Sequence, residues 1–295
     1  MINREAVIVS LSFQGQPKDK IINRVEEEAK KGCDMIVLPE TWTGDIPETI
    51  DDTTARLQAI AGEFGVYIIN AVALKGVHPR SNSAVLINRS GEIQGIYNKM
   101  YPYWSEFDLK PQIFIGENAP VFETDFGRVG MAICFDANFN CVWEELGNHN
   151  ADIVLWSSAY SAGTTLQAHA LNYNYAIVSS TLACDCVVYD INGEEIFYDK
   201  AEENEILVSR VAVNTNRALF HENFNIEKRS KLLSKYPETV ILEKSMPREQ
   251  WFILKGRDGA QVKALAAEFG MEELRDYRRR SRTEIDRLRH KQKNV

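Results

Sequence analysis

The chain has 295 residues, of which 44% are apolar and 26% are charged. This balance is that of an ordinary globular protein, so it excludes a disordered or collagen-like chain. The formal net charge of −8 argues against nucleic acid as the main partner, because nucleic-acid binding depends on neutralising phosphates. No stretch approaches the roughly 18 apolar residues of a membrane-spanning helix, and the first residues lack the pattern of a secretory leader. We therefore expect a cytoplasmic protein without a membrane association.

The cysteines lie far apart and do not show the paired spacing of a disulfide framework or of a zinc site. They are Cys33, Cys134, Cys141, Cys184 and Cys186. We expect free thiols in a reducing compartment and no bound metal.

The N-terminal part of the sequence alternates buried strands and amphipathic helices. Apolar runs predict strands at 6–13 and 35–39, and the amphipathic segment 19–31 predicts the helix between them. Strand, helix and strand in this order begin a parallel α/β unit. A helix at 53–64 and a strand at 66–74 repeat the pattern.

Hairpins then enter the pattern, beginning with strands at 83–88 and 93–99 around the turn Ser90-Gly91. Antiparallel pairs are therefore mixed into the sheet. Further strands are expected at 121–124, 129–134, 152–157, 176–182, 187–190, 195–198 and 206–213, with helices from about 142 and at 165–174. So many strands with interspersed helices fit a sandwich of layers around one core. We expect one domain over 1–258 and a helical extension over 259–295.

The extension is basic between Arg275 and Lys293, with acidic residues interspersed. This mixture favours a solvated helix face or a subunit contact over a nucleic-acid site. Apolar residues recur in the extension at helical spacings, namely Ala264, Leu265, Ala267, Phe269, Leu274, Tyr277, Ile285 and Leu288. We expect this stripe to be buried against a neighbouring subunit or against the chain's own domain.

Three reactive residues stand where predicted strands end. Cys134 ends the run VGMAIC, a position that can expose a thiol while nearby backbone N–H groups point at an oxyanion. Such a thiol needs a lowered pKa or an adjacent base to attack as a thiolate. Glu40 ends MIVLPE and Lys99 ends IQGIYNK. Each residue alone is more often structural or solvated, but the three together indicate a catalytic site.

The segments around these residues resemble the motifs of the nitrilase superfamily of carbon–nitrogen hydrolases. VLPETWTG is similar to its glutamate motif, GIYNKMYPYWSE to its lysine motif and VGMAICFDANF to its cysteine motif, in the family order. The resemblance extends over about residues 5 to 255. It implies an α/β fold, a four-layer α-β-β-α sandwich of the nitrilase-superfamily type, to which the helical C-terminal extension is added. It also implies association into a homodimer or a larger homo-oligomer.

The resemblance further implies a role for each motif residue. Cys134 would be the nucleophile and Glu40 the general base, while Lys99 and the backbone N–H of Phe135 would hold the oxyanion. Glu106 would orient Lys99 or the substrate. The reaction would pass through a thioester, and no metal or organic cofactor would be required.

The sequence departs from the family pattern after the cysteine. Many relatives have Asp-x-Arg-Phe-Pro, whereas this chain has Asp136-Ala137-Asn138-Phe139-Asn140. Loss of the arginine disfavours a carboxylate-bearing substrate, although another basic residue could substitute. Asn138, Ser158 and Tyr160 are candidates for substrate contacts, whereas we interpret His169 as a packed or surface residue.

Several functions stay open on this basis. The sequence favours hydrolysis of a small amide or an N-carbamoyl amine. A nitrilase that acts on nitriles is disfavoured by Phe135-Asp136, because true nitrilases usually carry Trp-Glu at this point. A non-catalytic protein, or an ammonia-releasing subunit that depends on a partner, is the third alternative.

Overall fold

A computed structural model describes residues 2–293 of the chain. The described residues form two compact units. The larger unit is Ala6–Val213, and the smaller one combines the residues before Ala6 with those from Asn214 onward. This division differs from the expected boundary after residue 258.

The first sheet of the larger unit consists of β1 (Glu5–Phe13), β2 (Met35–Val37), β3 (Tyr67–Leu74), β4 (Ser81–Ile87), β5 (Ile93–Asn98) and β12 (Ile206–Asn214). Its strand order is β12-β1-β2-β3-β4-β5. The pairs β1–β2 and β2–β3 are parallel, whereas β3–β4 and β4–β5 are antiparallel. The parallel opening and the later hairpin follow the order expected from the sequence.

Two helices, α1 (Lys18–Lys30) and α2 (Thr53–Phe64), cover the outer face of this sheet. Side chains alternate along β1, so that Ile8 packs into the core between the sheets. Its neighbour Val9 packs on the other face with Ile21 and Leu57 of the helices. Both faces of the sheet are buried, which explains why its strands are almost continuously apolar.

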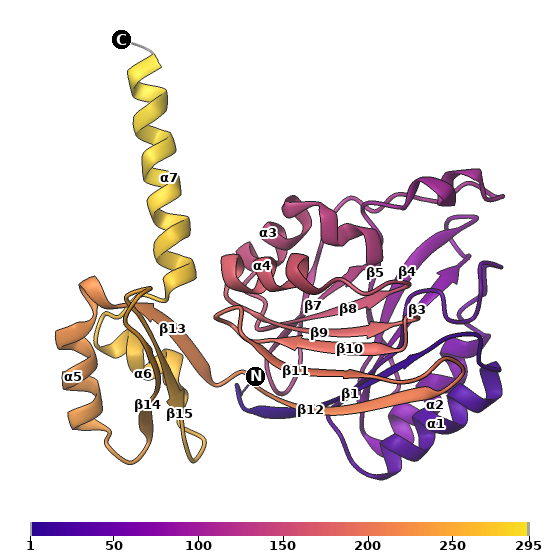
Figure 1. The fold of residues 1–295 in the computed structure, drawn as a ribbon, viewed down its shortest axis with the longest axis horizontal. Helices are drawn as coiled ribbons and strands as arrows, with labels where there is room; N and C mark the ends of the chain where they lie inside the picture. The colour runs from indigo at the N-terminus through magenta and orange to yellow at the C-terminus, as the bar shows by residue number, and fades with distance from the viewer. Residues whose placement is uncertain (1, 294–295) are drawn as a thin grey trace. The chain divides into compact units, whose positions relative to one another are not determined.

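The second sheet consists of β6 (Val121–Glu123), β7 (Arg128–Ile133), β8 (Ile153–Ser158), β9 (Ala176–Thr181), β10 (Asp185–Tyr189) and β11 (Glu195–Lys200). Its order is β11-β10-β9-β8-β7-β6, with a parallel centre of β7, β8 and β9. Helices α3 (Asn140–Asn148) and α4 (Gly163–Tyr173) cover its outer face. Figure 1 shows the two helix pairs on opposite outer sides of the sheets. The expected four-layer α-β-β-α sandwich is confirmed.

Hydroxyl groups cross between the two stacked sheets. Ser10 Oγ donates to the Ser179 carbonyl at 2.7 Å, and Ser157 Oγ donates to the Leu38 carbonyl at 2.7 Å. The hydroxyls of Ser10 and Ser157 are buried, so these bonds satisfy polar groups that would otherwise be costly. They also fix how the strand ends of one sheet face those of the other.

The smaller unit has its own sheet and its own core. It contains β13 (Arg217–His221), η3 (Glu222–Phe224), α5 (Ile226–Lys235), β14 (Val240–Met246), β15 (Trp251–Gly256), α6 (Val262–Glu268) and α7 (Leu274–Lys293). The three strands are ordered β13-β15-β14. Phe220, Leu232, Phe252 and Ala266 belong to one buried cluster. Because this cluster joins residues on both sides of 258, the helical extension is part of a larger folded unit.

The apolar stripe of the extension divides into two parts. Leu265 and Phe269 pack against the buried cluster of the smaller unit, and Leu274 is 2% exposed. Ile285 and Leu288 on α7 are 47% and 45% exposed. Part of the stripe thus packs within the smaller unit, whereas Ala264, Ala267, Ile285 and Leu288 are exposed. The homo-oligomer stays a prediction that sedimentation can test. Within residues 2–293, no helix is both long and apolar enough to cross a membrane.

Candidate active site

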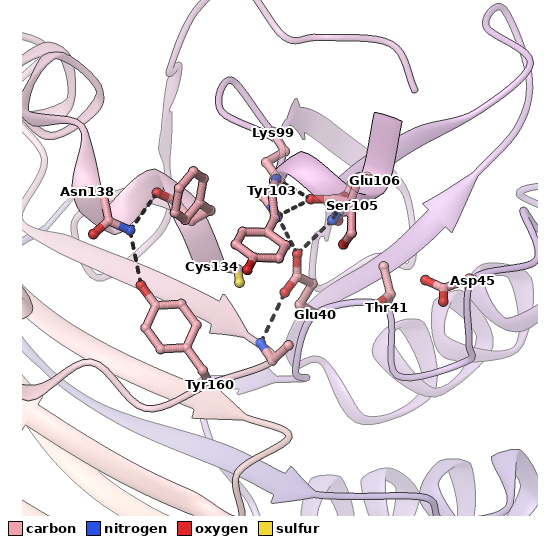
Figure 2. A pocket seen from close by; sticks show the side chains of 13 residues that line it. Glu40, Thr41, Asp45, Lys99, Tyr103, Ser105, Glu106, Cys134, Asn138 and Tyr160 are labelled. Carbon is pink, nitrogen blue, oxygen red and sulfur yellow. Dashed lines mark hydrogen bonds and ion pairs between the residues drawn. The ribbon is translucent and has the colours of Figure 1, made fainter. Parts of the chain in front are cut away.

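The three strand-end residues meet at one cavity of about 530 Å³ (Figure 2). Lys99 directly follows β5, Cys134 directly follows β7, and Glu40 lies shortly after β2. The cavity is therefore built where strand ends of both sheets come together. It is lined by Glu40, Thr41, Asp45, Asn82, Lys99, Tyr103, Ser105, Glu106, Cys134, Phe135, Asn138, Ala159 and Tyr160.

Cys134 lies at a sharp change of backbone direction. It is the first residue of the short helix η2 (Cys134–Asn138), and its φ is 46°. A non-glycine residue in this left-handed region is strained, and such strain is common where a functional side chain must be presented. The Trp156 indole N–H donates to the Cys134 carbonyl at 3.1 Å and holds the turn. Cys134 is 7% exposed, so a substrate must enter the cavity to reach it.

A network of charged and amide groups surrounds Lys99. Its Nζ lies 2.7 Å from Glu40 Oε1 and 2.7 Å from Glu106 Oε2. Asn82 Nδ2 donates to the same two carboxylates, at 2.7 Å and 2.9 Å. Glu106 comes from η1 (Trp104–Asp108) and also accepts from the Tyr103 N–H at 2.6 Å. Figure 2 shows Lys99, Glu40 and Glu106 joined by these interactions.

Glu40 is held by both sheets. Its second carboxylate oxygen, Oε2, accepts from the Ala159 N–H at 3.0 Å. Ala159 follows β8, and Ser157 of the same strand is bonded to Leu38 shortly before Glu40. One carboxylate oxygen therefore faces Lys99 while the other faces the second sheet. Figure 2 shows the Cys134 sulfur and the Glu40 carboxylate facing the same space.

The electrostatics of the cavity set the resting proton positions. Burial, together with the Glu40 carboxylate, raises the pKa of the Cys134 thiol to about 12, against the opposing influence of Lys99. Burial alone would lower the pKa of Lys99, but the Glu40 and Glu106 carboxylates, together with the Cys134 thiolate when it forms, outweigh burial and raise that pKa. At neutral pH the site holds an ammonium and a neutral thiol. The thiol must therefore lose its proton to a base as it attacks.

Asp136 connects the cysteine turn to the lysine segment. Its carboxylate accepts hydrogen bonds from the Ile133 N–H at 2.9 Å, the Tyr101 N–H at 2.9 Å and the Tyr97 hydroxyl at 2.6 Å. Ile133 directly precedes Cys134, while Tyr97 and Tyr101 lie on either side of Lys99. Asp136 is fully buried, and burial raises its pKa to about 7. One side chain thus fixes the spacing between the thiol and the ammonium.

We expect Asp136→Asn to lower the free energy of unfolding by about 1–3 kcal/mol, because the amide leaves one buried N–H donor without an acceptor. The folded state holds the Asp136 proton more tightly than the unfolded chain, since its pKa rises from 3.8 to about 7. Its contribution to stability is therefore fully present below about pH 4 and is lost as the pH rises through about 7. Urea unfolding of wild type and variant over this range measures both effects.

Tyr97→Phe is the matched control for this variant, because it removes the hydroxyl and keeps both backbone bonds to Asp136. Tyr97→Phe should lower the free energy of unfolding by about 1 kcal/mol. The pH-dependent contribution should persist in Tyr97→Phe and disappear in Asp136→Asn. Equal pH dependence in wild type and Asp136→Asn would contradict the raised pKa.

Two of the three candidates for substrate contacts line the cavity, and the third does not. Asn138 and Tyr160 line the cavity, with Asn138 Nδ2 lying 3.4 Å from the Tyr160 hydroxyl. Ser158 does not line it. Its hydroxyl donates to the Tyr160 carbonyl at 2.8 Å and accepts from the Tyr160 N–H at 3.0 Å. The expected substrate contact of Ser158 is therefore corrected: its hydroxyl supports the loop that carries Tyr160.

His169 is packed behind the cavity wall. Its Nε2 lies 2.8 Å from the carbonyl of Ala137 in η2, and its ring stacks on Trp143 at 4.3 Å. Burial lowers the pKa of His169, so the neutral ring is favoured. This agrees with its interpretation as a packed residue. Within the described part of the chain, no group of three or more His, Cys, Asp or Glu residues could hold a metal ion.

Some cavity residues were not singled out from the sequence. Tyr103 and Ser105 lie inside the lysine motif and Thr41 inside the glutamate motif, so their neighbours in the sequence could have indicated them. Asn82 and Asp45 carry no such signal, because a single polar residue near a strand or in a loop is ordinary.

Comparison with known proteins places this chain in the nitrilase superfamily. Residues 17–219 match the family model described as carbon-nitrogen hydrolase. The chain belongs to the carbon–nitrogen hydrolase family. The match lies almost wholly in the larger unit and is shorter than the expected span of 5 to 255.

Over the aligned segments, curated relatives are between about a quarter and a third identical to the chain. A β-ureidopropionase of Arabidopsis thaliana is 26% identical over 178 residues, which are 53% of this chain and 44% of the relative. A nitrilase of Pyrococcus abyssi is 32% identical over 144 residues, which are 44% and 53% of the two chains. An ω-amidase of Xenopus tropicalis is 26% identical over 177 residues, which are 52% of this chain and 62% of the relative. The matches cover about half the length of these relatives.

Solved structures share the fold at lower identity. An amidase from Nesterenkonia sp. has a TM-score of 0.62 and 18% identity, over 80% of this chain and 98% of the amidase. A carbon-nitrogen hydrolase from Helicobacter pylori G27 has a TM-score of 0.61 and 18% identity, over 79% and 93% of the two chains. At these identities the likeness concerns the fold.

Proposed function

We propose that the protein hydrolyses a carbon–nitrogen bond in a small amide or N-carbamoyl amine through a thioester on Cys134. The observation that carries this proposal is the placement of the Cys134 thiol in a cavity beside a Glu40 carboxylate that is bonded to Lys99. Membership of the carbon–nitrogen hydrolase family supports the same reaction class. The matched relatives include an ω-amidase and a β-ureidopropionase, and their names support a substrate of the amide or carbamoyl type.

In the first half of the reaction, Glu40 takes the thiol proton while the Cys134 sulfur attacks the substrate carbonyl carbon. The carbonyl oxygen becomes an oxyanion. An ammonium has three N–H donors, and two donors of Lys99 are committed to Glu40 and Glu106. The third donor and the Phe135 backbone N–H are proposed to hold the oxyanion. When the carbon–nitrogen bond breaks, the proton on Glu40 passes to the leaving nitrogen, so that ammonia or an amine departs.

In the second half, Glu40 takes a proton from water, and the hydroxide attacks the thioester carbonyl. The carbon–sulfur bond breaks and the sulfur recovers the proton from Glu40. The acid is released and the starting thiol is restored. Glu106 and Asn82 do not exchange protons in this scheme. They position Lys99 and Glu40 through the bonds already described.

An ammonia-release screen tests the proposed substrate class. The panel should contain aliphatic amides, N-carbamoyl amines, N-carbamoyl amino acids and nitriles. We expect release from amides or carbamoyl amines, and loss of that release in Glu40→Gln, because the amide side chain cannot accept the thiol proton. Release from nitriles alone would identify a nitrilase instead. Release that persists in Glu40→Gln would remove Glu40 from the mechanism.

A further inference from the structure

Among the described residues that line the cavity, the single cation is already paired with carboxylates, so it does not neutralise a carboxylate on a substrate. Of the described residues that line it, four carry a formal charge, namely Glu40, Asp45, Lys99 and Glu106. Lys99 is bonded to both Glu40 and Glu106. The cavity wall is therefore negative overall, and a carboxylate on a substrate would meet like charges at close range.

Another cation, Arg80, contacts Asp45. Its Nη1 donates to the Asp45 main-chain carbonyl, and its Nη2 lies 3.6 Å from Asp45 Oδ1. The Arg80 side chain is 3% exposed, whereas that of Asp45 is 70% exposed. Asp45 lines the cavity, whereas Arg80, which contacts it, is not among the lining residues. Figure 2 shows Asp45 beyond Thr41, on the side away from Asn138 and Tyr160.

The guanidinium of Arg80 has binding capacity that the protein does not use fully. Its Nε is buried and has no hydrogen-bond partner among the described residues. Nε and Nη2 form the edge of a guanidinium that binds a carboxylate through two parallel hydrogen bonds. At 3.6 Å, the Asp45 carboxylate makes an ion pair with this edge without a hydrogen bond.

We propose that Asp45 determines the charge specificity of the cavity by covering and neutralising Arg80, so that amides ending in a neutral or cationic group are selected over amides ending in a carboxylate. This inference rests on the proposed function. Asp45 is a specificity-determining residue and not a catalytic one, because the bonds to Lys99 come from Glu40 and Glu106. Removing its side chain would open the Nε–Nη2 edge of Arg80 to a substrate carboxylate.

A matched set of three amides tests the inference. Glutaramide is neutral, glutaramate replaces its far amide with a carboxylate, and δ-aminovaleramide carries an ammonium at the far end. In the wild type, kcat/KM for glutaramate should be at least about tenfold below that for glutaramide, because like-charge contacts are costly. The kcat/KM for δ-aminovaleramide should be at least equal to that for glutaramide.

In Asp45→Ala, the ratio of glutaramate to glutaramide should rise at least about tenfold, since the guanidinium gains a carboxylate partner. The double variant Asp45→Ala/Arg80→Met should lose this gain, and Asp45→Asn should show a smaller gain because the side chain still covers Arg80. Asp51→Ala is the control, because Asp51 follows Asp45 closely in the sequence and is exposed, but it does not line the cavity. It should leave the ratio unchanged.

The same three compounds should also be titrated calorimetrically against Cys134→Ala, alone and combined with Asp45→Ala. Binding that follows the expected charge order without any turnover in Cys134-containing enzyme would reject the proposed function and leave the role of Asp45 standing. Hydrolysis with equal kcat/KM for glutaramate and glutaramide in the wild type would overturn the inference. An unchanged ratio in Asp45→Ala would overturn it as well.

Discussion

Replacing Cys134 with alanine is expected to lower kcat on the order of 10⁴-fold or more, because the sulfur is the proposed covalent nucleophile and the cavity offers no other thiol among its described lining residues. The fold should persist, since Cys134 contributes one small side chain at the end of a strand. Steady-state hydrolysis of an amide identified by the screen, together with thermal unfolding, measures both quantities.

Cys141→Ala is the matched control for this variant. Cys141 follows Cys134 closely in the sequence, but it is exposed and contacts the Tyr101 hydroxyl outside the cavity lining. Its loss should leave kcat within about twofold, which corresponds to a change of less than about 0.5 kcal/mol in the barrier. Normal turnover by Cys134→Ala would contradict the mechanism, as would inactivity of a folded Cys141→Ala enzyme.

Replacing Lys99 with methionine should lower kcat by about 10²–10³-fold while KM changes much less, because the ammonium is proposed to favour the transition state. The same change leaves the buried carboxylates of Glu40 and Glu106 without their cation. Breaking a buried ion pair in this way typically costs about 3–5 kcal/mol of stability. The variant should therefore be both slower and less stable.

A double variant separates these two effects. Lys99→Met/Glu106→Gln removes one of the opposed carboxylates, so it should recover part of the lost stability without recovering kcat. Lys110→Met serves as a control, because Lys110 is exposed. Recovery of kcat together with stability would show that Lys99 acts only through folding. A change confined to KM would contradict its proposed contact with the oxyanion.

The sequence predicted those elements whose local hydrophobic pattern matches their burial in the folded protein. β1, α1 and β2 are marked by apolar runs and one amphipathic segment, and the structure places them within a few residues of the expected bounds. Glu40, Lys99 and Cys134 could be singled out because each ends such a run. Strand ends on the same side of stacked sheets lie close together. The place of these three residues at the ends of predicted strands therefore indicated that their side chains meet in space.

The less predictable part depends on contacts between distant segments. The strands of the smaller unit mix charged and apolar residues, as in VILEKSM of β14, and no linker rich in Gly, Pro or Ser marks its start at Asn214. Asn82 joins the active-site network through bonds to Glu40, which follows β2, and to Glu106 of η1, and these segments are separate along the chain. Ser158 was expected to face the substrate, but sequence position does not reveal that its hydroxyl is bonded to Tyr160.

Trapping the covalent intermediate tests the proposed mechanism most directly. Wild-type enzyme turning over a hydrolysable amide is quenched in acid, which preserves thioesters, and its peptides are analysed by mass spectrometry. We expect the acyl group of the substrate to be attached to the peptide containing Cys134, and we expect no such peptide with Cys134→Ala. An acyl group on Cys33, Cys141, Cys184 or Cys186 in an active enzyme, or a labelled non-cysteine residue, would contradict the proposed mechanism.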